Sequence, residues 1–293
     1  MDDRPSGNIS TGPAIIKRHI MKTWIAVLAA SLWILGADAA NAAKGETLVE
    51  FFANQGCAVG PSTRLLARDA GFSDDAIEAL LSKADGDDET VRTGGWIVLP
   101  PALCRIRPPE VRSEIRIDDP EVKALTTPMD VYSEFNETGC FLGGSPLMDR
   151  VQETRGWSAE KANSEYLRFI AENLRSGDLA FYSDDILRTP PNFQILTGDC
   201  ADVPEIDDIR RSQKLRDQHF GPLIRADAPD ADCGSGEGPS YHFLEQAKKR
   251  TNGKITNAWI GIEVQMMAIG GGWFEGTSVT QKGNPRPPIC HFD

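Results

Sequence analysis

The chain has 293 residues, with 43 acidic against 31 basic side chains and a formal net charge of −12 at pH 7. This surplus of negative charge disfavours binding to nucleic acid and to anionic membrane surfaces, because both carry negative charge themselves. The length suffices for one large domain or a few small ones.

The N-terminal segment has the order of a secretory signal peptide. A basic stretch at 17–22 precedes an uncharged apolar run at 24–36, and small residues of the A-x-A form follow at 37–42. The apolar run is too short to span a bilayer comfortably. We therefore predict a signal peptide over 1–42, cleaved at its end, with Met21 as an alternative start, and a periplasmic or secreted location. The alternative is an uncleaved membrane anchor.

All six cysteines lie after this segment. An even number of cysteines in an exported chain predicts disulfides rather than free thiols. No C-x-x-C motif occurs, so the cysteines do not indicate a thioredoxin-like redox centre or a zinc ribbon. The candidate disulfide residues are Cys57, Cys104, Cys140, Cys200, Cys233 and Cys290.

An internal repeat organises the cysteines. Segments 50–57 and 134–140 both run Glu-Phe, a polar spacer and Gly-Cys. A Gly-aromatic-Ser triplet follows each of them, at 71–73 and 156–158, and each block then has a Pro-Pro pair before its second cysteine. The last third shares only the end of the pattern, with Gly-Gly-Trp at 271–273, a Pro-Pro pair and a final cysteine.

The repeat predicts which cysteines pair. If a module was duplicated together with its disulfide, the first and last cysteine of each copy must bond to each other. The predicted pairs are therefore 57–104, 140–200 and 233–290. The predicted domains are 43–125, 126–205 and 206–293, the third being a divergent copy.

Within the first block the patterns predict three helices and a hairpin. The helices are expected at 48–55, 61–70 and 74–84, and a β-hairpin at 91–99 turns at Gly94-Gly95. Three helices and a small hairpin resemble the winged helix. The fold class is therefore predicted as α+β, with two winged-helix-like, disulfide-bonded modules and a C-terminal α+β segment.

Packing within the module is also predicted. Leu65, Leu66 and Ala70 should form the apolar side of the second helix, and Phe72 and Trp157 should occupy equivalent buried positions in the two copies.

The spacing of Ala67, Gly71 and Ile77 resembles a helix-turn-helix, in which Gly makes the turn between two closely packed helices. A role in reading DNA does not follow. The helix that would enter the groove carries Asp74, Asp75 and Glu78, and phosphates would repel these carboxylates. Winged helices also serve in protein contact, and that role suits this chain better.

The chain offers few signals of chemistry. The histidines after the signal segment, His219, His242 and His291, form neither H-x-x-x-H nor H-E-x-x-H. The phosphate-binding G-x-x-x-x-G-K-[ST] motif and the G-x-S-x-G motif are also absent from the sequence. We predict no metal and no cofactor.

Two segments have alternative interpretations. Asp227, Asp230, Asp232 and Glu237 crowd one loop that could hold Ca²⁺, although a solvated acidic loop is favoured. Segment 270–274, Gly-Gly-Gly-Trp-Phe, could border a binding groove, although a turn with buried aromatics is favoured. A glycosylation sequon stands at 136–138.

These patterns favour a noncatalytic binding or envelope-interaction protein. Its partner would be another envelope protein or a small ligand, with no nucleic acid and no stable membrane insertion after processing. The alternative is an exported hydrolase with a site in the C-terminal third and with His242, Asp230 and Asp232 as catalytic candidates. Convergence of polar groups on His242 in a pocket would favour the hydrolase.

Overall fold

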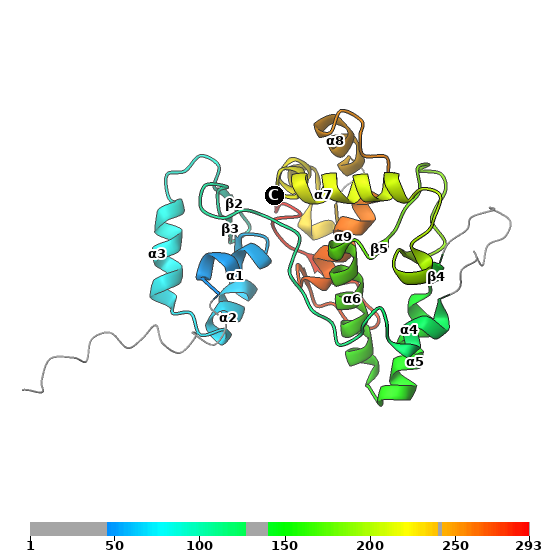
Figure 1. Cartoon of the computed structure of the whole chain (residues 1–293). Coiled ribbons are helices and arrows are strands. Elements are labelled where there is room, and N and C mark those ends of the chain that lie inside the picture. Colours follow the sequence, from blue (N-terminus) through cyan, green and yellow to red (C-terminus); the bar gives the residue numbers. More distant parts are fainter. Residues whose placement is uncertain (1–45, 127–139, 240–241, 293) are drawn as a thin grey trace, which may run out of the picture. The chain divides into compact units, whose positions relative to one another are not determined.

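The computed structural model describes residues 46–126, 140–239 and 242–292. The predicted signal peptide and the sequon at 136–138 lie outside the described residues. Within them the fold is a mixture of helices and small antiparallel sheets (Figure 1).

The first block has the helices and the hairpin that the sequence predicts. Its three strands form an antiparallel sheet in the order β1-β3-β2. Thr47 and Glu50 form a capping box at the start of α1, and the Ser73 side chain caps α3. The elements are α1 Leu48–Asn54, β1 Ala58–Val59, α2 Pro61–Asp69, α3 Asp74–Ala84, β2 Val91–Thr93 and β3 Trp96–Val98.

The predicted apolar side of α2 is wrong. Leu65 and Leu66 are 57% and 46% exposed, whereas Thr63 and Ala67 are buried. The hydroxyl of Thr63 donates to the carbonyl of Ala58 in β1 and accepts from the backbone N–H of Gly60. These bonds turn the Thr63 face of the helix toward the sheet, and the two leucines therefore face outward.

The second block shares the strand-helix-helix-strand-strand order of the first. Its sheet order, β4-β6-β5, is also the same. Phe72 and Trp157 are both half-buried against the core rather than fully buried. That the two blocks are repeated winged helices stays a prediction. The elements are α4 Pro120–Leu125, β4 Cys140–Leu142, α5 Gly144–Arg155, α6 Ala159–Ser176, β5 Leu179–Ala180 and β6 Phe193–Ile195.

The last block has a different order of elements. A helix, α8, follows directly after His242. Helix α9 packs along α6 of the second block (Figure 1). The block comprises α7 Ile206–Asp227, α8 Phe243–Arg250, α9 Ile260–Gly270 and the hairpin of β7 Phe274–Glu275 with β8 Asn284–Pro285, with short 3₁₀ turns at Ala228–Asp230 and Cys233–Ser235. A further 3₁₀ turn, Gly198–Cys200, lies at the end of the second block.

The structure contains the three disulfides that the repeat predicts. Cys57 bonds Cys104, Cys140 bonds Cys200 and Cys233 bonds Cys290, with Cα–Cα distances of 5.7, 5.6 and 5.0 Å. Disulfides are typical of extracellular and periplasmic proteins. Among the described residues, no helix has the length and apolar character needed to cross a membrane.

The C-terminal block is attached to α1 by buried polar contacts. The indole Nε1 of Trp273, which is fully buried, donates to the carbonyl of Asn54 over 2.8 Å. The guanidinium of Arg286, also buried, donates to the carbonyl and the side-chain oxygen of Gln55 over 3.0 and 2.8 Å. These contacts place the segment around Trp273 next to the end of α1.

Candidate functional site

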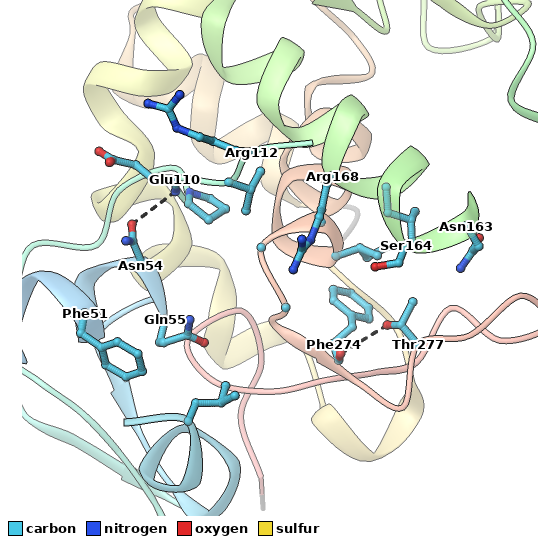
Figure 2. A pocket seen from close by; sticks show the side chains of 18 of the residues that line it. Phe51, Asn54, Gln55, Glu110, Arg112, Asn163, Ser164, Arg168, Phe274 and Thr277 are labelled. Carbon is cyan, nitrogen blue, oxygen red and sulfur yellow. Dashed lines mark hydrogen bonds between the residues drawn. The ribbon is translucent and has the colours of Figure 1, made fainter. Parts of the chain in front are cut away.

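A cleft of about 600 Å³ lies where four segments, distant in the sequence, meet (Figure 2). They are the α1–α2 region, the irregular segment 109–112, the N-terminal half of α6 and the segment from the end of α9 into the last hairpin. The residues that line the cleft include Glu46, Phe51, Asn54, Gln55, Leu66, Pro109, Glu110, Val111, Arg112, Glu160, Asn163, Ser164, Leu167, Arg168, Gly270, Gly271, Gly272 and Phe274.

Helix α6 supplies hydrogen-bond donors to the cleft. Ser164 and Arg168 are four residues apart and therefore lie on one face of the helix, with Asn163 beside them. Figure 2 shows Arg168 extending from α6 into the cleft toward Phe274, whereas Arg112 points away. Within the described residues, the side chains of Asn163 and Ser164 make no hydrogen bond, so both are available to a ligand.

Arg168 is held in place by a buried carboxylate. Its Nη1 lies 3.3 Å from Oε1 of Glu165, and the side chains of Arg168 and Glu165 are 51% and 7% exposed. The other oxygen of Glu165 accepts from the backbone N–H of Glu114 over 2.6 Å and from the Ser113 hydroxyl over 3.2 Å. The guanidinium is thus oriented at one nitrogen while its other N–H groups face the cleft.

The opposite side of the cleft is formed by the end of α1. The Asn54 side-chain oxygen accepts from the backbone N–H of Glu110 over 3.3 Å, which fixes segment 109–112 against α1. Since the side-chain oxygen of Gln55 is held by Arg286, its NH₂ group is the part left for a ligand. Phe51 adds a half-buried ring next to these two amides.

The glycine run at 270–272 lets the backbone approach its neighbours closely. A Cβ on Gly270 would lie 2.4 Å from the carbonyl oxygen of Leu167, and one on Gly271 would lie 2.5 Å from Pro109. Gly272 has φ +76° and makes the turn into the last hairpin. Trp273 and Phe274 are buried, so segment 270–274 is a turn with buried aromatics and also lines the cleft.

Both signs of charge border the cleft. Glu110 accepts from Arg175 over 2.8 Å, and Glu46 accepts from Asn54 over 3.2 Å. Glu160 makes no ion pair within the described part of the chain. Arg168 is therefore the cation aimed into the cleft, and Glu160 is the carboxylate left at its edge.

The candidates for a hydrolase lie elsewhere. His242, Asp230 and Asp232 are all exposed, and none of them lines the cleft or the two smaller cavities of about 390 and 210 Å³. His242 Nδ1 lies 3.5 Å from Glu245 within α8, and the Asp232 side chain accepts from the backbone N–H of Gly234.

The acidic loop shows no metal site within the described residues. Asp227 is buried, whereas Asp230, Asp232 and Glu237 are exposed, and no group of three or more potential metal ligands converges in the described ranges.

The sequence patterns identify only part of this cleft. Segment 270–274 is predicted as a possible groove border, but Arg168, Ser164 and Gln55 carry no recognisable motif. A signal exists only in the spacing of Glu160, Ser164 and Arg168, which places three polar side chains on one helix face. That pattern is common on solvent-exposed helices and could not single out a site.

No protein-family model matches the chain, and no curated protein or solved structure gives a significant match.

Proposed function

We propose that this chain is an exported, noncatalytic binding protein that holds its ligand in the cleft between α1, segment 109–112, α6 and the turn at 270–274. Three disulfides and a signal-type N-terminus support export.

One observation carries the binding role. Donors without partners in the described residues lie along the α6 side of the cleft: the outer N–H groups of Arg168, the Ser164 hydroxyl and the Asn163 amide. Phe51, Leu167 and Phe274 add apolar side chains to the same lining. A concave site that combines apolar side chains with a few polar groups able to bond a ligand is a common form of ligand site.

A cleft-filling variant tests this role. In Ser164→Trp the indole occupies the space over Arg168, whereas Ser145→Trp places the same ring on an exposed site of α5 outside the cleft. Full-length protein collected after export is incubated with envelope extract, and hydrogen exchange of its backbone amides is measured with and without the extract.

We expect the extract to slow exchange at 109–112 and 270–272 in the wild type and in Ser145→Trp, but not in Ser164→Trp. Equal protection in both variants, or none in the wild type, would contradict ligand binding in the cleft. If the wild type breaks down the protecting ligand and His242→Ala does not, the hydrolase alternative is favoured.

Export is tested separately. We expect N-terminal sequencing of the protein produced by its natural host to start directly after Ala42. A mature chain that retains Trp24 would instead show that the segment anchors the protein in a membrane.

We also propose that the first two blocks derive from one duplicated winged-helix-like module that serves in protein contact. Their common element order, strand order and disulfide placement support this. An experimental structure tests it, since the Cα traces of 57–104 and 140–200 should superpose over both sheets and both helix pairs. Different helix positions relative to the sheet would contradict a duplication.

A further inference from the structure

Segment 109–112 lines the cleft and has backbone groups without partners in the described residues. It belongs to no helix or strand, and its one backbone hydrogen bond in the described part of the chain is the donation from Glu110 N–H to the side-chain oxygen of Asn54. The N–H groups of Val111 and Arg112, and the carbonyls of all four residues, have no partner within the described part of the chain. Free backbone donors and acceptors can pair with the backbone of an extended peptide, in the way that the edge of a sheet does when a peptide adds to it.

Arg168 independently favours a ligand that carries a carboxylate. Its guanidinium carries five N–H donors in a planar fork, and the one contact to Glu165 leaves most of them free. That fork matches the two oxygens of a carboxylate, with which it forms paired, charge-assisted hydrogen bonds. Because Glu165 is buried and already bonded to the backbone at 114, it orients Arg168 in advance of binding.

From these two features we infer that the cleft binds an extended peptide, which pairs its backbone with 109–112 and places a carboxylate on Arg168. The inference rests on the proposed function, since it names the class of ligand for the same cleft. Phe51, Leu66 and Leu167 line the cleft with apolar surface that accepts the intervening side chains.

The acidic residues of the cleft do not cancel this preference. Glu110 is paired with the Arg175 guanidinium, and Glu46 is held by Asn54 on the α1 side of the cleft, opposite α6. Glu160 precedes Arg168 by eight residues along α6, which corresponds to about 12 Å of helix rise. That separation exceeds the Debye length of about 8 Å at physiological ionic strength. Glu160 therefore repels a carboxylate bound at Arg168 only weakly.

The carboxylate can belong to the end of the peptide or to an aspartate or glutamate side chain. A fluorescein-labelled library of random eight-residue peptides distinguishes the two sources. One half carries a free C-terminus and the other is amidated, and anisotropy titrations are made with the full exported protein. A preference for the free C-terminus identifies the chain end, whereas equal binding of amidated peptides enriched in Asp or Glu identifies the side chain.

Arg168→Gln tests the role of the guanidinium. We expect it to weaken binding of the selected peptides about 10-fold or more, since hydrogen bonds to charged groups are the strong ones. Arg168→Lys should restore part of the loss. The matched control is Arg150→Gln, because Arg150 is a comparably exposed helical arginine that also pairs with a glutamate three residues away. Peptides N-methylated along the backbone should also bind at least 10-fold more weakly than their parents.

The outcomes separate this inference from the proposed function. If no peptide binds the wild type, or if Arg168→Gln binds as tightly as Arg150→Gln, the inference is wrong. Binding of an uncharged oligosaccharide such as chitotriose, unaffected by Arg168→Gln, would also overturn it. In each case the cleft role survives if envelope extract still protects 109–112 in the wild type and not in Ser164→Trp.

Discussion

At the scale of single residues, the most buried charges join α7 to α9. Nη1 of Arg216 lies 2.7 Å from Oε2 of Glu263, and the two side chains are 0% and 1% exposed. Arg216 also donates to the carbonyl of Leu174, and Glu263 accepts from the backbone N–H of Phe181. Burial raises the pKa of Glu263, and the guanidinium of Arg216 opposes that shift.

Removing one partner of this pair should be costly. We expect Glu263→Ala to lower the free energy of unfolding by about 3 kcal/mol, because the buried guanidinium of Arg216 loses its buried partner and keeps only the partly exposed Asp217, 2.8 Å from its Nε. Glu78→Ala, which breaks the more exposed pair with Arg64, should cost less than about 1 kcal/mol. Urea unfolding measures both. The double variant Arg216→Met/Glu263→Leu should recover most of the loss, and equal losses in single and double variants would contradict this account.

Glu121 gives the fold a dependence on pH. The hydrogen bond from Arg155, with a further one from Thr154, lowers the pKa of Glu121 to about 2. The unfolded value is about 4.3, so the fold binds this proton more weakly than the unfolded chain does. Its stabilisation is complete above about pH 4.3 and is lost as the pH falls through about 2.

The measurement is urea unfolding at pH 6 and pH 2.5. We expect the free energy of unfolding of the wild type to exceed that of Glu121→Gln by about 1–2 kcal/mol at pH 6, after allowance for solvent screening. At pH 2.5 the difference should be much smaller. The exposed Glu153→Gln on α5 is the control. A difference that does not change with pH would show that Glu121 acts through packing alone.

At the scale of elements, glycines set how closely α9 approaches α6. We expect Gly270→Ala to lower the free energy of unfolding by about 1–3 kcal/mol, because its Cβ would lie 2.4 Å from the Leu167 carbonyl oxygen. Gly272→Asn is the control, since that position is open and has φ +76°, which asparagine tolerates. Thermal unfolding compares them, and equal melting temperatures would contradict the close approach.

The elements that the sequence predicts well are those with local signals. Ser73 before an apolar periodic stretch locates α3, and Gly94-Gly95 locates the turn of the hairpin. Helix α9 has no such periodicity, because α6 and its other neighbours surround it and apolar residues occupy all of its faces. For α2 the apolar pattern gives the wrong buried side. Leu65 and Leu66 suggest one face, but the hydrogen bonds of the Thr63 hydroxyl hold another face of the helix against the sheet.

At the scale of the whole molecule, the disulfides could be predicted and the cleft could not. The pairing follows from a repeat, which is a pattern along the chain. The cleft depends on long-range contacts such as Trp273 to Asn54 and Arg286 to Gln55, which join residues more than 200 positions apart. The local sequence around these residues does not indicate which residues they contact.

The disulfides should differ in their effect on the cleft. Cys57 and Cys104 flank the end of α1 and the start of the segment that leads to 109–112. We expect Cys57→Ser/Cys104→Ser to lower the free energy of unfolding by about 4 kcal/mol or less and to weaken cleft binding. Cys140→Ser/Cys200→Ser should lower stability similarly and leave binding unchanged. Urea unfolding and ligand titration at a temperature where both variants remain folded check this, and equal losses of binding would contradict it.

The three disulfides also bear on how the chain acquires its covalent structure. Each bond joins cysteines that are neighbours in order along the chain, and no bond encloses or crosses another. Such a chain emerges with its N-terminus first. An oxidase that joins each newly emerged thiol to the preceding unpaired thiol then makes only native bonds. If oxidation keeps pace with emergence, we therefore expect native pairing to need an oxidant but no isomerase.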